Sequence, residues 1–420
     1  MTSQGNATFS ADGKELEFPL VPAVEGCSGY DISSLMKETG NVTLDVGFVN
    51  TAACKSAITY IDGDEGILRY RGYPIDELAE HATFLEVAAL LFDGELPSQE
   101  RLSTLKEAVR EASVLPEGLE KIFDAFPEGA HPMHILSSVV PALGTYYADS
   151  LSIKDEAAIE KASAALLGAI PTLAAYAYRK SIGESFIAPD PSLEYVENFM
   201  HMMFGKKEDK ETVDALAMLF VLHADHEQNC SASTVRMVGS SEADLFQSIT
   251  AGIGALSGPL HGGANSAVLE MLETIQSTGD TAESFMDKVK NKVDGVKLMG
   301  FGHRVYKSYD PRAAIVKKTT HTILEKNGKD EQLELAMGLE ETALKDDYFV
   351  QRKLYPNVDF YTGLIYKSMG FPTDMFTVLF AIGRMPGWIA QWREQNQDPA
   401  KKIGRPRQVY TGATERSYPA

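Results

Sequence analysis

The sequence of 420 residues contains few cysteines and no dense cysteine pattern. Its three cysteines, Cys27, Cys54 and Cys230, form no CxxC motif, which excludes a disulfide-rich framework. The first residues, MTSQGNATFSADGK, lack a basic segment followed by an apolar core, so we expect no secretory signal peptide. These absences favour a reducing compartment, and we expect a cytoplasmic protein.

Basic residues are also scarce. Lys and Arg number 39 against 59 Asp and Glu, which gives a formal charge of −20. Nucleic acids and anionic membrane surfaces require a basic face, so we expect neither as a partner. A small anionic ligand is compatible with this charge, because a local basic pocket can form in an acidic protein.

Long charge-free apolar segments are few. The best candidate for a membrane span is ASAALLGAIPTLAAYAY at residues 162–178, which is short for a bilayer and contains Pro171. We expect a buried core helix there.

Two kinds of periodicity divide the chain. Residues 1–55 include GKELEFPLV and GNVTLDVGFVN, whose alternating pattern predicts a small strand-rich module, and Asp62-Gly63 predicts a β-hairpin. From Pro74, at a plausible first helical position, apolar residues recur at three-four spacing in about eleven segments. The sequence therefore predicts a mainly α fold with a small N-terminal β-rich module.

Two histidines one helical turn apart, His223 and His226 in HADHEQN, lie beside Glu227 and one turn before Cys230. Such a pair can bind zinc, and a metal-dependent hydrolase is one hypothesis. The acid stands outside the pair, unlike the H-E-x-x-H motif, so anion binding or a structural role is the alternative.

A third histidine, His261, stands in LSGPLHGGANSAVLEML. We expect Pro259 to end one helix and another to begin near Asn265, so that a helix N-terminus keeps His261 neutral. A neutral imidazole can donate to a developing oxyanion. The alternative is that the glycines only permit close helix packing. GIGALSG, at residues 252–258, is a weak match to a dinucleotide fingerprint.

Two further segments expose single polar groups. In LMGFGHRVYKSYDPRAA, Gly300 and Gly302 precede His303 in a locally basic loop. In KLYPNVDFYTG, Asp359 has apolar and aromatic neighbours. If that carboxyl group is buried, its pKa rises and suits a general base; the alternative is a helix N-cap. Arg384 follows the apolar FTVLFAIG, and an arginine there can bind a carboxylate.

Together the motifs LHADHEQN, GPLHGGAN, GFGHRVYKSYDPR, LYPNVDFYTG and RPRQVYTG, in this order, resemble the citrate synthase family over nearly the whole chain. The N-terminal module is similar to the longer bacterial type II form. The resemblance implies a two-domain helical fold, with a large helical domain at 56–263, a small mobile domain at 264–370 on the acetyl-CoA side, and a return to the large domain with a C-terminal tail at 371–420.

The resemblance also implies an acyltransferase of the tricarboxylic acid cycle that joins acetyl-CoA to oxaloacetate and hydrolyses citryl-CoA to citrate and CoA. His303 would polarise the ketone of oxaloacetate, Asp359 would take a proton from the acetyl methyl group, and His261 would stabilise the enol. No metal or cofactor is implied, since acetyl-CoA is a substrate and CoA a product.

By the same resemblance, oxaloacetate is held by His226, Arg312 and Arg384, and by Arg405 from a neighbouring subunit. This implies at least a homodimer, and a hexamer is the larger assembly of the type II form. Closure of the small domain would exclude water from the reaction.

This sequence departs from the type II family pattern in the segments linked to regulation by NADH. Type II enzymes that NADH inhibits have a histidine-containing segment and a reactive cysteine. Here the corresponding segment, VREASVLPEG, contains no histidine and has Arg110 as its clearest remnant, and KKEDKE contains no cysteine. We therefore expect NADH to inhibit poorly.

Three alternatives stay open. A 2-methylcitrate synthase uses propionyl-CoA on the same fold. A metal-dependent hydrolase would use His223, His226 and Glu227. A helical binding scaffold would carry no chemistry, and neither of the last two explains the settings of His261, His303 and Asp359.

Overall fold

The computed structural model describes residues 5–11, 13–327 and 331–419. The chain separates into two compact units. One comprises Met1–Ser56 with Gly404–Ala420, and the other comprises Ala57–Ile403. The groups of the candidate site discussed below lie in the second unit, except for Arg405.

The first unit contains two small antiparallel sheets and one short helix. Strand β1 (Ala7–Ala11) pairs with β2 (Lys14–Phe18), β3 (Leu20–Val21) pairs with β4 (Gly29–Tyr30), and α1 spans Leu35–Thr39. The predicted strand in GNVTLDVGFVN is absent among these described elements. Instead the Asp45 carboxylate accepts hydrogen bonds from Val49 N and Asn50 N, which bend this segment into a loop.

The second unit opens with a three-stranded antiparallel sheet of β5 (Thr59–Asp62), β6 (Ile67–Tyr70) and β7 (Tyr73–Pro74). Asp62 is paired with Ile67, so the predicted hairpin is confirmed with a loop longer than the two residues of the tightest hairpins. Asp62 Oδ1 accepts from Asp64 N and Glu65 N and organises that loop.

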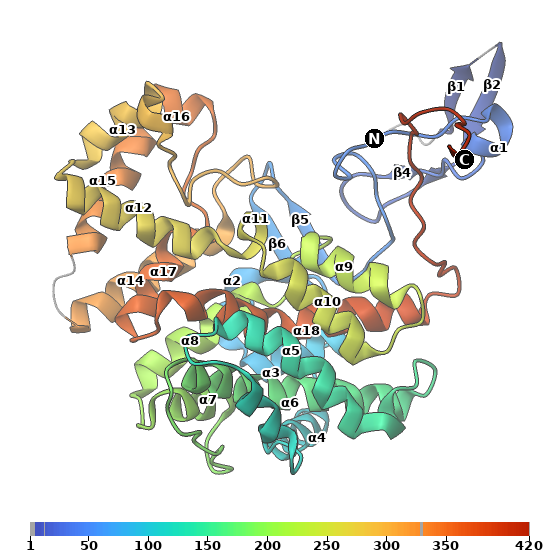
Figure 1. Ribbon diagram of the computed structural model, residues 1–420. Helices are drawn as coiled ribbons and strands as arrows, with labels where there is room; N and C mark the ends of the chain where they lie inside the picture. Colours follow the sequence, from blue (N-terminus) through green and yellow to red (C-terminus); the bar gives the residue numbers. More distant parts are fainter. Residues whose placement is uncertain (1–4, 12, 328–330, 420) are drawn as a thin grey trace. The chain divides into compact units, whose positions relative to one another are not determined.

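Helices form the rest of the second unit, which confirms the mainly α prediction (Figure 1). In chain order they are α2 (Ile75–His81), α3 (Phe84–Asp93), α4 (Gln99–Ser113), η1 (Leu119–Ala125), α5 (Pro132–Gly144), η2 (Thr145–Ser150), α6 (Glu156–Ser181), α7 (Tyr195–Phe204), α8 (Lys210–His223), α9 (Cys230–Gly239), α10 (Leu245–Leu256), α11 (Pro259–Gly262), α12 (Ala264–Thr278), α13 (Ala282–Lys290), η3 (Val293–Gly295), α14 (Pro311–Asn327), α15 (Glu331–Lys345), α16 (Asp347–Gln351), α17 (Val358–Ser368), η4 (Thr373–Met375) and α18 (Phe376–Gln397).

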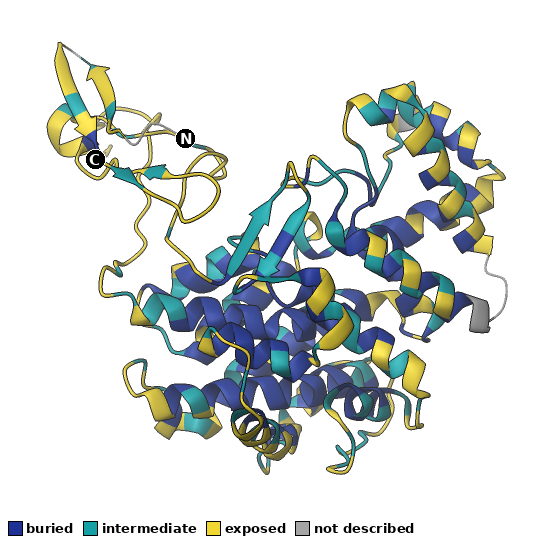
Figure 2. Ribbon diagram, turned by 180° about the vertical axis from the view of Figure 1, so that it is seen from behind, coloured by how far each residue is buried: buried dark blue, intermediate teal, exposed yellow. Residues whose placement is uncertain are grey.

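Two long helices, α6 and α18, form much of the buried core (Figure 2). Helix α18 contacts α3, α6, α8, α9 and α10. By length and composition α6 could cross a membrane, but 83% of its apolar window is buried inside the protein. This agrees with the prediction of a core helix at residues 162–178.

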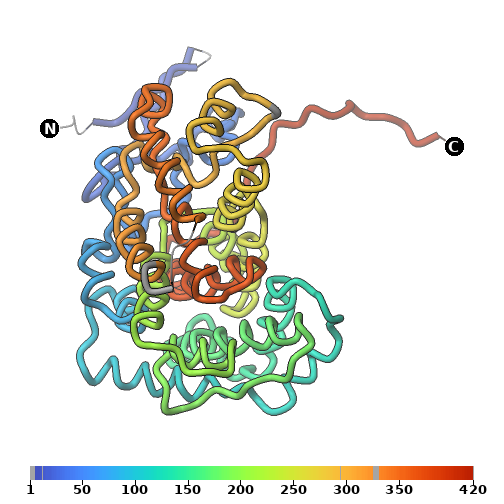
Figure 3. Tube along the Cα trace, turned by 90° about the vertical axis from the view of Figure 1, so that its left-hand side faces the viewer, coloured from blue at the N-terminus to red at the C-terminus, as the bar shows by residue number. Residues whose placement is uncertain are grey.

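Helices α12 to α17 gather on one side of this unit, away from α4, α6 and α7 (Figure 1). Within that group α17 packs against α12 and α14 (Figure 3), and α14 also contacts α2 and α8. The loop before α14 carries His303, and the first turn of α17 carries Asp359. Since α14 also contacts α2 and α8, both residues lie on elements close to the rest of the second unit. Movement of residues 264–370 as a small domain stays a prediction.

Two helix boundaries differ from the sequence prediction. The expected continuous helix from Pro74 is broken, because Thr83 and Glu86 form a capping box that starts α3 afresh. Pro259 does not end a helix: α10 stops at Leu256, and Pro259 opens the short α11, where its missing N–H costs nothing.

Candidate active site

The loop before His303 is fastened to the loop before Asp359. Gly300 and Gly302 adopt left-handed conformations, with φ of +76° and +74°. Gly302 N donates to Tyr355 O at 2.8 Å, and Asn357 N donates to Gly300 O at 2.9 Å. The Asn357 side chain donates to Gly302 O at 2.8 Å. The two glycines therefore allow the His303 loop to run antiparallel beside residues 355–357.

The imidazole of His303 is oriented by its own loop. Its Nδ1 accepts hydrogen bonds from Val305 N at 3.0 Å and Tyr306 N at 3.2 Å. A nitrogen that accepts from amides carries no proton, so the neutral ring is protonated at Nε2. Burial, assisted by the charge of Arg312, lowers the pKa of His303 to about 4. Near neutral pH this side chain is therefore an uncharged donor.

His261 is held in the opposite tautomer. Its Nε2 accepts from Ser231 N at 3.3 Å and lies 2.8 Å from Ser231 Oγ, in the first turn of α9. Its remaining Nδ1 therefore carries the proton. Burial and the charge of Arg384 lower the pKa of His261 to about 4. The expected neutral ring is thus present, but the helix N-terminus that the ring contacts is that of α9, not α12.

Asp359 is the second residue of α17. The N-cap of this helix is Asn357, whose side chain accepts from Asp359 N at 3.0 Å, so the N-cap alternative for Asp359 is wrong. Burial, with a smaller effect of Asp310, raises the pKa of the Asp359 carboxyl group to about 6, against the lowering effect of Arg312. Within the described residues its carboxylate oxygens have no hydrogen-bond partner. Such a group can accept a proton near neutral pH.

Arg312 is locked onto a buried carboxylate. Its Nε and Nη2 donate to the two oxygens of Asp310 at 3.0 and 2.9 Å. Asp310 Oδ2 also accepts from Val358 N at 3.2 Å, at the start of α17. Asp310 therefore joins Arg312 to the helix that carries Asp359, and neutralises part of the local positive charge.

Arg384, on α18, is buried with an unused donor. Its Nε donates to His223 O at 2.5 Å, whereas its Nη1 has no hydrogen-bond partner in the part of the chain that the structure describes. The guanidinium lies 4.8 Å from the centre of the Phe380 ring. The ring centres of His223 and His261 lie 5.0 and 6.1 Å from the centre of that same phenylalanine ring. Because buried arginine N–H groups are normally satisfied, the free Nη1 points to an anionic ligand.

A second cluster surrounds Tyr306. His226 Nε2 lies 3.2 Å from the Tyr306 hydroxyl, and the ring of His303 is centred 5.4 Å from that of His226 and 4.8 Å from that of Tyr306. The Arg312 guanidinium lies 5.9 Å from the Tyr306 ring centre. Burial lowers the pKa of His226 well below its usual value, so this ring is also neutral. The structure thus brings His226, His303 and Arg312 together.

Arg405 is an exposed residue of the other compact unit. Its role as an oxaloacetate ligand supplied by a neighbouring subunit stays a prediction.

The metal-site alternative gains no support from the described part of the chain. His223 Nδ1 donates to Leu219 O at 2.7 Å, and the Glu227 carboxylate accepts from Ile61 N at 3.1 Å. Cys230 is exposed. Among the described residues there is no group of three His, Cys, Asp or Glu side chains placed to hold a metal ion.

Sequence analysis did not single out three residues that hold these groups in place. Asp310 could have been identified from its position two residues before Arg312 at a helix start. Ser231 sets the tautomer of His261 from 30 residues away, and Tyr306 contacts His226 across 80 residues. No local pattern marks either of these long-range contacts.

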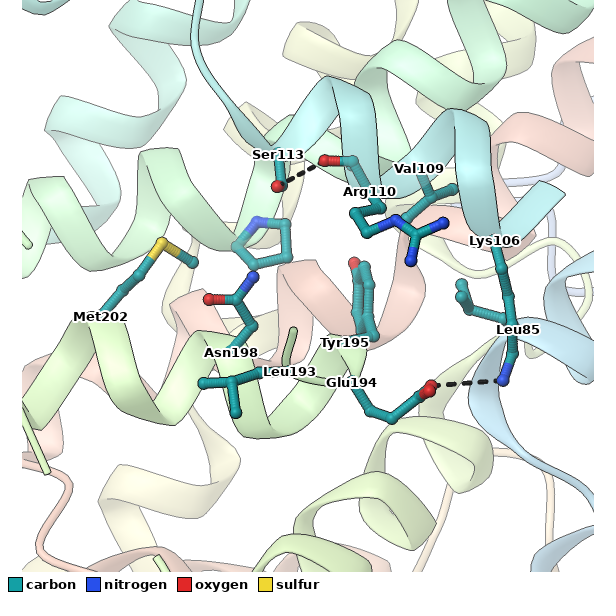
Figure 4. A pocket seen from close by; sticks show the side chains of 12 residues that line it. Leu85, Lys106, Val109, Arg110, Ser113, Leu193, Glu194, Tyr195, Asn198 and Met202 are labelled. Atoms are coloured by element: carbon teal, nitrogen blue, oxygen red, sulfur yellow. Dashed lines mark hydrogen bonds and ion pairs between the residues drawn. The ribbon is translucent and has the colours of Figure 1, made fainter. Parts of the chain in front are cut away.

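A separate pocket of about 80 Å³ lies between α4, α6 and α7 (Figure 4). Arg110 and Lys106 line it, and Lys106 Nζ lies 3.2 Å from Glu194 Oε2. Its described lining contains neither histidine nor cysteine.

Comparison with known proteins agrees with this arrangement. Residues 47–407 match the family model described as citrate synthase, C-terminal domain. The chain is 59% identical over 418 residues to citrate synthase 1 of Mycobacterium tuberculosis, covering 98% of this chain and 97% of the relative. It is 57% identical over 421 residues to citrate synthase of Corynebacterium glutamicum, covering 99% and 96%.

Solved structures show the same similarity. Citrate synthase from Pyrobaculum aerophilum superimposes with a TM-score of 0.81 at 36% identity, covering 88% of this chain and 92% of that one. A ternary complex of citrate synthase from Thermoplasma acidophilum with carboxymethyl coenzyme A and oxaloacetate gives 0.80 at 31% identity, covering 88% and 96%. This chain belongs to the citrate synthase family.

Proposed function

We propose that His261, His303 and Asp359 carry out the condensation of acetyl-CoA with oxaloacetate. The observation that best supports this assignment is the complementary state of the three groups. Two neutral histidines each have one ring nitrogen occupied by backbone amides, which leaves the other as a donor. The carboxyl group of Asp359 has a pKa raised to about 6, suited to a base.

In the proposed first step Asp359 takes a proton from the methyl group of acetyl-CoA while His261 Nδ1–H donates to the thioester oxygen. A thioester α-proton is only weakly acidic, so removal of the proton and stabilisation of the oxygen must coincide. The product is the enolate of acetyl-CoA, whose oxygen is stabilised by the hydrogen bond from His261, and Asp359 is then protonated.

In the proposed second step the enolate carbon attacks the ketone carbon of oxaloacetate. A carbon–carbon bond forms as the π bond of the ketone opens, and the oxygen takes the proton of His303 Nε2 to become the citrate hydroxyl. The proton that Asp359 removed is released to solvent, from which His303 regains one. Water then cleaves the thioester of citryl-CoA, which gives citrate and CoA. Neutral donors suit this site because they stabilise the oxygens without repelling the nearby arginines.

Oxaloacetate carries two carboxylates, and the cationic groups around the site fit them. The free Nη1 of Arg384 and the guanidinium of Arg312 supply charge, and His226 supplies a neutral polar contact. Arg405 from a second subunit completes the set in a homodimer, which is also the building block of a hexamer. We also place the enzyme in the cytoplasm.

The alternative acyl donor, propionyl-CoA, is not favoured, because the relatives at 57–59% identity are named citrate synthases. The direct test is CoA thiol release by purified protein with oxaloacetate and either acyl-CoA. We expect faster release from acetyl-CoA. A preference for propionyl-CoA would move the assignment to 2-methylcitrate synthase.

Single substitutions test whether His303 and Asp359 act in catalysis or whether the protein is a binding scaffold without chemistry. His303→Ala and Asp359→Ala should each reduce kcat by about a hundredfold or more. The exposed His81, remote from these groups in the sequence, provides His81→Ala as a control that should retain full activity. Full activity in the His303 and Asp359 variants would contradict the mechanism.

A further inference from the structure

The side chain of Tyr306 stands among three residues assigned above to oxaloacetate. Its hydroxyl lies 3.2 Å from His226 Nε2, its backbone N donates to His303 Nδ1, and its ring faces the Arg312 guanidinium at 5.9 Å. The side chain is 2% exposed. The phenol is therefore enclosed by the groups that a dicarboxylate must reach.

These groups have few free hydrogen-bond donors to share between the phenol and a substrate. Nε and Nη2 of Arg312 are already used by Asp310, and the guanidinium faces the tyrosine ring. The tyrosine ring thus borders the guanidinium that a substrate carboxylate is proposed to reach.

The contact with His226 has a defined chemical consequence. The oxygens of oxaloacetate in its dianionic keto form are acceptors only, so His226 must present an N–H to bind one of them. In this structure the Nε2 position is taken by a phenol oxygen, which can accept the same N–H. The phenol and a substrate oxygen are therefore competitors for one ring nitrogen.

We propose that Tyr306 is a positioning residue whose hydroxyl occupies the substrate position on His226 until oxaloacetate displaces it. The phenol keeps His226 aligned in the empty site, and its hydrogen bond must break before the substrate binds. This inference rests on the proposed function of the site.

Tyr306→Phe tests the competition, because it removes the hydroxyl and keeps the ring. One ordinary neutral hydrogen bond corresponds to about a two- to tenfold change in a binding constant. We expect the Kd for oxaloacetate, measured by calorimetry, to fall by that factor. The KM for oxaloacetate should fall with it, and kcat should stay within about twofold of wild type, because the hydroxyl is displaced before the chemical step.

The matched control is Tyr309→Phe, in the same loop. The Tyr309 hydroxyl lies 3.0 Å from Glu340 Oε1, so its loss should leave oxaloacetate affinity unchanged. An unchanged or higher Kd in Tyr306→Phe would overturn the proposal, since the hydroxyl would then be a bystander or a direct substrate ligand. Absence of oxaloacetate-dependent thiol release by the wild-type protein would instead reject the proposed function.

A spectroscopic measurement checks the same point independently of affinity. In protein with ¹⁵N-labelled histidine, the Nε2 signal of His226 should differ between wild type and Tyr306→Phe without substrate. With saturating oxaloacetate the two signals should coincide, because the phenol has left the ring nitrogen in both. A difference that persists in the bound state would overturn displacement.

Discussion

At the scale of a single residue, opposing effects set the pKa of the Asp359 carboxyl group. Burial raises the pKa of its carboxyl group to about 6, although Arg312 and Arg384 both act to lower it. Its place in the first turn of α17 also favours the charged form. The burial effect is the largest, so the group changes charge close to neutral pH.

The activity should follow this titration. A general base acts when deprotonated, so kcat/KM for acetyl-CoA should rise with pH and level off above a midpoint near 6. The pKa values of His261 and His303 lie lower, at about 4, so they should stay neutral across this range. A pH–rate profile from pH 4.5 to 8.5 measures the midpoint, and a flat profile through pH 6 would exclude Asp359 as the titrating base.

The same raised pKa predicts an effect on stability. The native state binds this proton more tightly than the unfolded chain, in which the pKa of the carboxyl group is near 3.8. The stability that this proton contributes is therefore lost as the pH rises from about 4 towards 6. Asp359→Asn should therefore raise the free energy of unfolding by about 1–3 kcal/mol at pH 7.5, and by much less at pH 4. Thermal unfolding at both pH values, with the exposed Asp124→Asn as control, tests this; equal gains at both would contradict it.

Sequence analysis identified His261, His303 and Asp359 because their local surroundings are unusual. Glycines follow His261 and precede His303, and apolar residues flank Asp359. It did not identify Ser231, which sets the tautomer of His261, because Ser231 acts through a contact that forms only in the folded chain. A hydrogen bond across 30 residues leaves no periodic pattern in the sequence.

At the scale of elements, the β5–β6 hairpin supports the loop that carries His303. Gly63 O accepts from Lys307 N at 2.7 Å and from Ser308 N at 3.1 Å. A Cβ atom on Gly63 would lie 2.2 Å from Val305 O, closer than any side chain tolerates. Gly63 is therefore required for the hairpin loop to lie against this loop.

Gly63→Ala should displace the His303 loop and reduce kcat/KM by about ten- to a hundredfold, since small misplacements of catalytic groups are costly. The matched control is Gly254→Ala in α10, where a Cβ atom would meet nothing within 4 Å. Steady-state kinetics of both variants provide the comparison. An unaffected Gly63→Ala enzyme would show that the hairpin does not position the loop.

Most helices were predictable from their three-four apolar spacing, but their boundaries depended on capping. Thr83 divides one apolar run into two helices because it caps α3 together with Glu86. Pro259 begins a helix instead of ending one. The loop organised by Asp45 has the alternation of a strand, but the Asp45 carboxylate accepts hydrogen bonds from Val49 N, Asn50 N and Thr51 Oγ1, which bend it.

At the scale of the whole molecule, Arg405 connects activity with assembly. If a neighbouring subunit supplies it, Arg384→Ala and Arg405→Ala proteins should each be nearly inactive alone. Random mixing of the two subunits makes half of the dimers hybrid, each with one intact site, so about one quarter of wild-type activity should return. Co-expression followed by assay tests this, and no recovery would place Arg405 outside the partner's site.

Regulation by NADH is also a whole-molecule property. The pocket beside Arg110 holds about 80 Å³, and pockets for drug-sized ligands measure about 300 Å³ or more. Lys106 is already paired with Glu194. We expect micromolar NADH to leave the initial rate unchanged. Inhibition at low micromolar NADH that weakens with salt or in Arg110→Ala would contradict this prediction.

The hydrogen bonds between residues 300–302 and 355–357 have a consequence for opening and closing. They join the loop that carries His303, the proposed ketone-polarising group, to the helix start that carries Asp359, the proposed base. Any swing of this part of the chain carries His303 and Asp359 together and preserves their separation. Their separation is thus set at folding, and the predicted closure of residues 264–370 would only have to bring this pair to His261.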